Sequence, residues 1–441
     1  MHAGDKRLKT LGNSACPYSA NEVREMRWYK SLDANGRAAF MASFLGWGLD
    51  ALNYMVYTFA IAALIHVFHI DLGRAGMLGT ITLLTSAVGG WGAGILADRY
   101  GRVRVLQVTI LWFTITTAAI GFAQSFAQIF WLRALQGLGF GGEWAVGSVL
   151  MGEIITASLD RGKAVGTVQS AWALGWGLAA IMYTLLFSLL PEGYAWRALF
   201  WIGLLPALLV LYIRRYLHEP ELFSKTRAKQ NAVGMRSSPW IIFSPGLLRT
   251  TLLASLLCMG CQGGYYAVTT WLPTYLKTTR HLSVLNTGGY LMVIIVGAFC
   301  GYLVGAHLTD RLGRRANLIL FSILSGISLY LYTEVPLSNG AMLVMGFPLG
   351  FAASGIFSGI GAYLTELYPT EARANGQGFT YNFGRGVGAL FPTLVGYLSQ
   401  GMGLGMAIAI FAGGAYALVL VTTLSLPETK GRVLGMVESM E

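Results

Sequence analysis

The stretch GILADRYGRVR, residues 94–104, decides the fold of this chain because it recurs in altered form as AHLTDRLGRRA, residues 306–316. Each copy lies between two long apolar runs and joins them through a short charged loop. The separation along the chain between the aspartates of the two copies, Asp98 and Asp310, defines the repeat offset. A motif that returns about half a chain length later indicates an internal repeat. We therefore expect further pairs of similar residues separated by the same offset.

Two further matches occur at this offset. Arg161 and Arg373 are separated by it, and the same shift aligns LGWGLDALNY with LCMGCQGGYY, which places Asp50 on Gln262. Several matches at one offset predict two similar halves, with a binding site between them near the middle of the molecule.

The composition predicts what surrounds these halves. Hydrophobic residues make up 55% of the 441 residues and charged residues 12%, whereas a soluble domain carries about 25% charged residues. About 20 apolar residues cross a bilayer as a helix, and only helices and closed barrels satisfy the backbone in lipid. The apolar runs are long and do not alternate as barrel strands do. The sequence therefore predicts an all-α membrane protein with twelve transmembrane helices in two six-helix bundles.

The apolar runs also define the predicted boundaries. The predicted spans are 38–68, 75–97, 105–123, 127–154, 163–190, 196–216, 247–276, 286–309, 316–333, 340–365, 373–400 and 403–426. The predicted domains are an N-terminal segment (1–37), a six-helix bundle (38–216), a linker (217–246), a second six-helix bundle (247–426) and a tail (427–441).

The basic residues are unevenly distributed over the predicted loops. With the N-terminus inside, and with residues at the ends of the spans counted in the adjoining segments, the cytoplasmic segments hold 25 of the 31 Lys and Arg residues, the outer segments hold four and the spans hold two. This asymmetry follows the positive-inside rule and places both termini in the cytoplasm. It also explains the net charge of +11 without a nucleic-acid partner. Residues 1–37 contain no apolar core or cleavage site of a secretory signal.

Motifs of catalytic or metal chemistry are missing from the sequence. Cys258 and Cys261 form a CxxC, but no second ligand pair exists, so we interpret them as small buried residues. No nucleotide-binding loop, His/Cys cluster or nucleophile–base pair stands out. We therefore expect no cofactor, no metal site and no enzymatic activity.

The repeated stretch resembles a known family signature. GILADRYGRVR resembles the loop signature of the major facilitator superfamily, and TDRLGRR resembles its weaker second copy, with Ala306 in place of Gly94. RALQGLGFGGEW (133–144) resembles the RxxQGxG motif of that superfamily, and LPETKGR (426–432) resembles its common C-terminal tail. The resemblance covers about residues 38–432 and implies transport by alternating access.

Within the superfamily, the chain is most similar to bacterial organic-acid/proton symporters of the sialate and aromatic-acid groups. LDALN (49–53) is similar to their LDGFD, WRALFWIGLLP (196–206) resembles the sialate group, and NFGRGVGALFP (382–392) resembles their GRxGA…P stretch. Asn53 stands where the pattern has a second Asp. The resemblance implies a multi-pass importer of a small organic anion and a proton in the bacterial inner (cytoplasmic) membrane, and we expect a monomer.

Four charged residues lie deep inside the predicted spans, away from their ends: Asp50, Arg133, Glu143 and Arg385. An ionised group in a bilayer is costly and is retained where it faces a water-filled cavity. We expect Asp50 and Glu143 to carry the proton, because a carboxyl beside an apolar cavity can load and release one near neutral pH, and Arg133 to tune them. The alternatives are structural ion pairs for the two acids and a snorkelling position at the outer edge for Arg133.

Arg385 cannot deprotonate, and its planar fork matches a carboxylate. We expect it to bind the carboxylate of the substrate, with a permanent salt bridge to Asp50 or Glu143 as the alternative. Polar residues of several spans complete the predicted substrate site: Asn53, Tyr54, Gln169, Gln262, Tyr266 and Asn382.

Acidic and basic side chains recur at the cytoplasmic ends of both halves. Bridges between such groups can bias a two-state rocking motion, whereas topology alone explains the bases but not the repeated acids. The predicted gating residues are Asp98, Arg99, Arg102, Glu153, Arg161, Asp310, Arg314, Glu366 and Arg373.

Other transport functions use the same fold. A facilitator or proton symporter of a neutral solute such as a sugar would make Arg385 structural. Drug efflux is disfavoured, because the fifth span reads SAWALGWGLAA and lacks the Gly-Pro motif usual in that branch.

Overall fold

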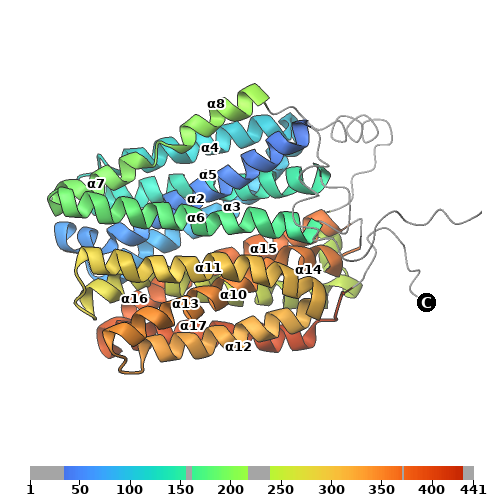
Figure 1. Ribbon diagram of the computed structural model, residues 1–441. Coiled ribbons are helices and arrows are strands. Elements are labelled where there is room, and N and C mark those ends of the chain that lie inside the picture. Colours follow the sequence, from blue (N-terminus) through green and yellow to red (C-terminus); the bar gives the residue numbers. More distant parts are fainter. Residues whose placement is uncertain (1–33, 155–160, 217–238, 370–371, 431–441) are drawn as a thin grey trace, which may run out of the picture.

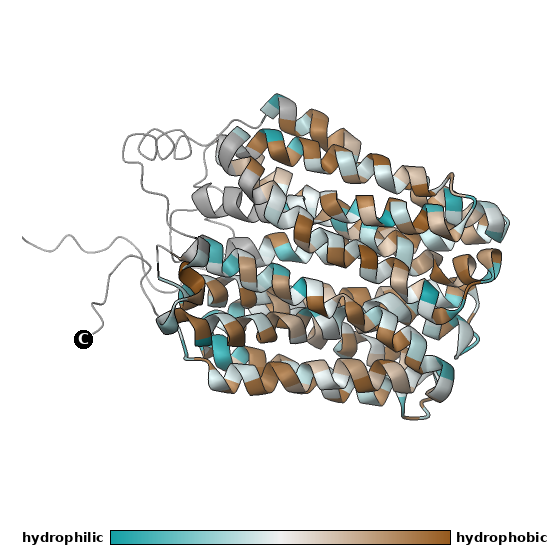
Figure 2. Cartoon of the chain, turned by 180° about the vertical axis from the view of Figure 1, so that it is seen from behind, coloured by the Kyte–Doolittle hydropathy of each residue, from teal (hydrophilic) through white to brown (hydrophobic). Residues whose placement is uncertain are grey.

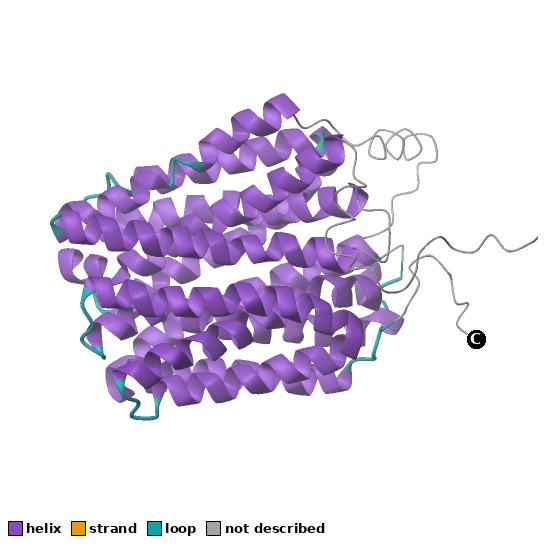
Figure 3. Cartoon of the chain, viewed as in Figure 1, coloured by secondary structure: helices purple, strands orange, loops and turns teal. Residues whose placement is uncertain are grey.

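The computed structural model describes residues 34–154, 161–216, 239–369 and 372–430, which form long helices with no strand among them (Figure 1 and Figure 3). The first half comprises α2 (Ala34–Phe68), α3 (Leu72–Tyr100), α4 (Arg102–Ile120), α5 (Phe126–Ile154), α6 (Arg161–Leu189), α7 (Glu192–Ile202) and α8 (Pro206–Tyr216). The second half comprises η1 (Pro239–Phe243), α10 (Pro245–Thr278), α11 (Val284–Leu312), α12 (Arg314–Thr333), α13 (Asn339–Gly355), η2 (Ile356–Ser358), α14 (Ile360–Leu367), α15 (Arg373–Gly388), α16 (Leu390–Met402) and α17 (Leu404–Ser425). The predicted all-α class is confirmed.

The two halves lie side by side, with α2 to α8 on one side and α10 to α17 on the other (Figure 1). They meet chiefly where α6 packs against α11 and α3 against α16. The hydroxyl oxygens of Thr80 and Thr393 lie 2.6 Å apart across this interface. At one end of the bundle, Lys277 of α10 donates to Glu192 of α7 at 2.9 Å. The contacts between the halves thus combine polar pairs, close helix approaches and a buried apolar cluster to which both halves contribute.

The internal repeat is visible in the backbone. Gly101 follows α3 with φ 107°, and Gly313 follows α11 with φ 105°. His69 and His281 follow α2 and α10 with φ 50° and 55°. The members of each pair are separated by the repeat offset that relates Asp98 to Asp310. A φ near 105° is one that residues with a Cβ rarely adopt, which explains the glycine in both charged motifs.

Three predicted spans are interrupted rather than continuous. The spans at 196–216, 340–365 and 373–400 each divide into separate helical pieces, and η2 separates α13 from α14. Pro206 and Pro392 lie in the first turns of α8 and α16, where they cannot donate to the carbonyl four residues earlier. The other helices begin and end within a few residues of the predicted positions.

Large apolar side chains are exposed along the helices. Trp91, Val108 and Leu189 are 72%, 65% and 77% exposed, and Figure 2 shows hydrophobic residues spread along the helix lengths. Eight helices or helix pairs of the described part are long and apolar enough to cross a membrane. The remaining four, α3, α5, α10 and the α15–α16 pair, bring the set to the predicted twelve, and for these four the membrane span stays a prediction.

Glycines bring α3 and α5 into backbone contact. A Cβ on Gly89 would overlap the backbone of Leu138, and one on Gly141 would overlap the carbonyl of Ser86. Side chains larger than hydrogen would push these helices apart, as at other close helix pairs in membranes. The GLGFGG run therefore positions α5, which carries Arg133 and Glu143.

We expect Gly141→Val to destabilise the protein by about 1–3 kcal/mol, because backbone atoms cannot yield to the new side chain. Gly92→Val is the matched control on α3, where a Cβ would meet nothing within 4 Å. The melting temperature of both purified variants in detergent measures the difference. Equal melting temperatures would contradict the close approach of α3 and α5.

Candidate functional site

Two carboxyl groups face each other inside the first half. Asp50 of α2 is 0% exposed and Glu143 of α5 is 5% exposed. Gly46 lies one turn before Asp50, and the Glu143 carboxyl occupies the space that a Cβ on Gly46 would take. Glu143 acts on Asp50 both through its charge and as a possible hydrogen-bond partner, and Arg385 acts on it as the opposite charge. No donor among the described residues bonds either Asp50 oxygen, so the pair can form a hydrogen bond only when it holds a proton.

Arg385 of α15 is held by an amide and by aromatic rings. Its side chain is 1% exposed, and its Nε donates to Gln262 Oε1 at 3.3 Å. Gln262 Nε2 in turn donates to the Tyr381 carbonyl at 2.9 Å. The rings of Phe140 and Tyr381 each lie 5.2 Å from the guanidinium carbon. These contacts fix the guanidinium without neutralising its charge.

One donor of this guanidinium is unused. Arg385 Nη1 is buried and has no hydrogen-bond partner. No ion pair within 4.0 Å joins Arg385 to Asp50 or Glu143, which are all described residues. The alternative of a permanent salt bridge is therefore wrong for this conformation. A buried guanidinium in this state has a strong tendency to accept an anion.

An aromatic cavity adjoins this free donor. The space between its lining atoms, open solvent included, is ≈ 320 Å³, and most of this space is in narrow gaps between side chains. Its walls come from both halves: Trp47, Gln169, Trp172, Tyr265, Tyr266, Tyr302, Phe357, Tyr381 and Arg385. Tyr266 of this lining meets Tyr54, to which the repeat relates it and which lies outside the lining, with ring centroids 5.5 Å apart. The cavity combines one cation with many ring faces, which suits a flat anion.

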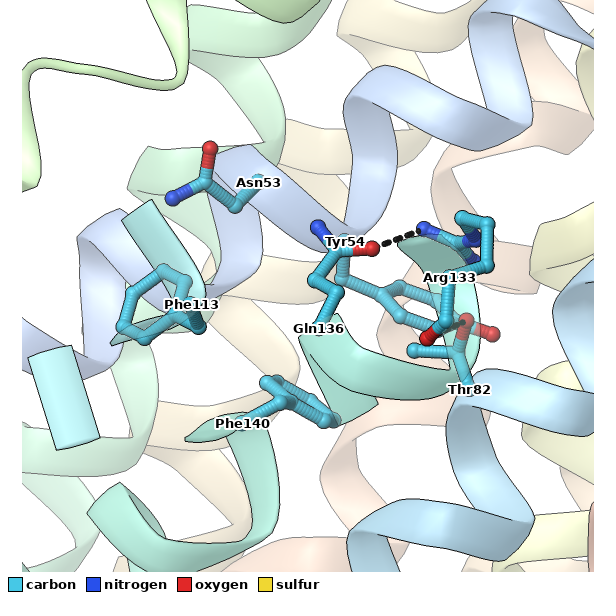
Figure 4. Close-up of a pocket in the computed structure, with 7 residues that line it drawn as sticks. All are labelled: Asn53, Tyr54, Thr82, Phe113, Arg133, Gln136 and Phe140. Carbon is cyan, nitrogen blue, oxygen red and sulfur yellow. Dashed lines mark hydrogen bonds between the residues drawn. The ribbon is translucent and has the colours of Figure 1, made fainter. Parts of the chain in front are cut away.

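Arg133 belongs to a second pocket. Its Nε donates to the Leu78 carbonyl at 3.2 Å, its Nη1 donates to Gln136 Oε1 at 2.7 Å, and its carbon lies 4.0 Å from the centre of the Tyr57 ring. The side chain is 0% exposed, so the snorkelling alternative is wrong. Within the described residues no carboxylate lies within 4.0 Å of it, and its Nη2 has no hydrogen-bond partner. Figure 4 shows this pocket, of ≈ 200 Å³, with Asn53, Tyr54, Thr82, Phe113, Arg133, Gln136 and Phe140 around it.

The structure separates two predicted substrate residues from the aromatic cavity. Asn53 is 1% exposed and lies in the second pocket, where neither of its amide atoms has a partner. Asn382 donates to the Gly378 carbonyl of its own helix at 3.0 Å and faces Gly90 of α3. Neither lines the cavity beside Arg385.

Several cavity residues were missed by the sequence analysis. Trp47, Trp172, Tyr265, Tyr302, Phe357 and Tyr381 line the cavity but were not predicted. Four of them stand one helical turn from a predicted residue: Trp47 before Asp50, Trp172 after Gln169, Tyr265 after Gln262 and Tyr381 before Arg385. Residues three or four positions apart share a helix face, so this spacing is the signal that could have found them.

The described members of the predicted gate form one cluster in the second half. Arg314 holds Glu366 through two hydrogen bonds of 3.0 Å and 2.8 Å, and reaches Asp310 at 3.4 Å. Thr429 donates to Glu366 at 2.6 Å. These bonds join α11, α12, α14 and the segment after α17 within one half. The side chains of the other predicted gating residues lie outside the described part: Asp98, Arg99, Arg102, Glu153, Arg161 and Arg373.

Glu428 fixes the same segment to the first turn of α12. Its carboxylate accepts hydrogen bonds from the backbone N–H groups of Arg314 and Arg315, each at 3.0 Å. Partial burial raises the pKa of Glu428, but four backbone N–H donors together lower it by more than burial raises it. The pKa therefore lies below its usual value of 4.5. The ionised carboxylate thus caps a helix N-terminus at neutral pH.

Comparison with known proteins agrees with this architecture. The sequence profile of the Major Facilitator Superfamily matches residues 43–392 and 293–435. A protein of Cupriavidus pinatubonensis named as a probable 4-methylmuconolactone transporter is 43% identical over 92% of this chain and 93% of its own length. The cis,cis-muconate transport protein of Acinetobacter baylyi is 30% identical over 86% of this chain and 91% of its own. A sialic acid transporter of Escherichia coli is 27% identical over 89% and 95%.

We expect Glu366→Gln to lower the melting temperature by several degrees, because it leaves the Arg314 guanidinium, 12% exposed, with a weakened partner. Asp310→Asn is the control in the same cluster. Its carboxylate is 39% exposed, and an exposed pair contributes only about 0–1 kcal/mol. Melting curves of the two purified variants test this order, and a larger loss in the Asp310 variant would contradict it.

Proposed function

Because this chain belongs to the major facilitator superfamily, and is therefore a multi-pass membrane transporter rather than an enzyme, we propose that it imports a small organic acid together with a proton. Transport would proceed by alternating access, with the cavity beside Arg385 as the substrate site. The distribution of Lys and Arg supports a bacterial inner-membrane location with both termini in the cytoplasm.

The single observation that carries this proposal is the free Nη1 of Arg385. A buried guanidinium that lacks a carboxylate partner is costly, and a substrate carboxylate would supply the missing charge and hydrogen bond. A neutral solute would leave this charge uncompensated. The geometry therefore favours an organic anion over the neutral-solute alternative.

The shape and lining of the cavity favour a flat acid. Rings surround Arg385 on several sides, and ring faces pack well against planar unsaturated groups. Relatives named for a methylmuconolactone and for muconate point to the same chemistry. We infer that the substrate is an unsaturated or aromatic carboxylate.

The facing carboxyls of Asp50 and Glu143 supply a proton site. Two such groups without a donor repel each other when both are ionised, and a proton removes this repulsion. A substrate anion and a proton together add no net charge to the interior. This balance is a physical reason for the two to move together, because a net charge in the membrane is costly.

The proposed gate lies at the ends of the helices that carry Asp310, Arg314 and Glu366. In the described residues these three brace a single half, so we propose that they keep that half rigid while the two halves rock. For Asp98, Arg99, Arg102, Glu153, Arg161 and Arg373 we propose a gating role. In this role their side chains would close the inner gate by forming ion pairs between the two halves.

We expect Arg385→Lys to weaken carboxylate binding about 10–100-fold, since an ammonium cannot reproduce the fork that a carboxylate accepts. Uptake of radiolabelled carboxylates into proteoliposomes, together with binding to the purified protein, measures this. Arg74→Lys is the control, at an exposed position beside Asp71. Unchanged uptake by the Arg385 variant would refute its role in substrate binding.

We expect Asp50→Asn to lose accumulation driven by an imposed pH gradient while it retains exchange of substrate across the membrane. The amide keeps the shape of the side chain but cannot take up a proton. Asp71→Asn is the control, because Asn also caps a helix and Asp71 lies at the N-cap of α3. Full accumulation by the Asp50 variant would exclude Asp50 from proton coupling.

A further inference from the structure

Two buried polar groups face the aromatic cavity from opposite halves without a partner. One is Nη1 of Arg385 on α15, and the other is the side-chain oxygen of Gln169 on α6. Gln169 is 7% exposed, and its amide makes no hydrogen bond in the described part of the chain. The Trp172 indole, by contrast, donates to the Tyr265 hydroxyl at 2.6 Å. The cavity thus offers a ligand one cation and one complete amide.

The unpaired amide of Gln169 points to a ligand, because burying a polar group without a hydrogen bond costs free energy. Leaving a buried polar group without a partner costs about 1–3 kcal/mol, and a ligand that pairs with it recovers this free energy on binding. The amide offers an acceptor oxygen and two N–H donors. A protonated carboxyl matches it best, since its hydroxyl donates to the amide oxygen while its carbonyl accepts from the amide nitrogen.

We propose that the substrate is a flat acid with two carboxyl groups, one bound as the anion by Arg385 and the other bound as the neutral acid by Gln169. This inference rests on the proposed function, because it assumes that Arg385 binds a carboxylate. One negative charge on the ligand then meets one guanidinium. The planar centre of the acid lies among the rings of Trp172, Tyr266 and Tyr381.

A ligand held at both ends connects the two halves. Gln169 belongs to α6 and Arg385 to α15, so a dicarboxylic acid draws the first half toward the second. An acid with one carboxyl can bind Arg385 but leaves Gln169 unpaired. Binding energy that appears only when both ends are engaged favours closure around the correct substrate.

The test compares trans,trans-muconate with sorbate, which has the same diene and a methyl group in place of one carboxyl. Binding of both to the purified full-length protein is measured by calorimetry for wild type, Gln169→Leu and Gln124→Leu. Gln124 is exposed and serves as the matched control. We expect wild type and the Gln124 variant to bind muconate about tenfold more tightly than sorbate. The Gln169 variant should bind both acids equally, with its sorbate affinity unchanged.

The pH dependence gives a second readout. If one carboxyl binds as the neutral acid, muconate binding to wild type should strengthen as the pH falls, more steeply than sorbate binding, and the Gln169 variant should lose this difference. Equal affinity of wild type for the two acids, or a preference that survives in the Gln169 variant, would overturn this inference alone. Failure to bind or transport any carboxylate would instead overturn the proposed function.

Discussion

An ionised side chain inside a membrane-spanning bundle must have a partner, a proton or water, and the arrangement of this protein depends on that constraint. Arg133 has a carbonyl, an amide and a ring as partners, and its Nη2 has none. Asp50 has no donor for either oxygen, and Arg385 has an unused Nη1. Incomplete pairing is thus common to these buried charges, and they differ in what adjoins them. Arg385 lies beside a cavity lined by both halves, whereas Arg133 lies in a pocket of the first half. This difference in position, more than the presence of charge, marks the candidate site.

The internal repeat supplies the scaffold, and departures from it supply the chemistry. Backbone conformation is the same at Gly101 and Gly313, where the turn requires it. At the corresponding interior positions the residues differ: Asp50 in the first half aligns with Gln262 in the second. Gln262 holds Arg385, whereas Asp50 faces Glu143. Acids therefore gather in one half and the free cation in the other, which makes the interface between them the place where substrate and proton can interact.

The sequence predicted well where most helices begin and end, and poorly in which direction their side chains point. Apolar runs and the constant offset between the two halves were enough to place most helices, because both are properties of the chain itself. The surroundings toward which a side chain points depend on which neighbouring helix packs against that face of its own helix. Successive residues of a helix point about 100° apart, so Tyr54 reaches the ring of Tyr266 in the other half, while Asn53 beside it contributes only to the second pocket. Tyr381 and Asn382 differ in the same way, since Tyr381 lines the cavity and Asn382 faces α3.

The contrast between contacts within and between the halves bears on how the molecule could move. Inside the first half, α3 and α5 touch through glycines whose neighbours are backbone atoms, and such contacts allow little sliding. Between the halves, side-chain pairs such as Thr80 with Thr393 and Lys277 with Glu192 can break singly and be replaced by water. The halves also meet at glycines of α3 and α16, where a Cβ on Gly76 or Gly396 would overlap backbone atoms of the other half. The two stiff bodies can rock as units only if this glycine contact separates while the polar pairs are replaced. The cavity lies between the two bodies, with Gln169 on one and Arg385 on the other, so this motion changes the distance between its two polar groups. The shape of a site confined to one half would not change in this way.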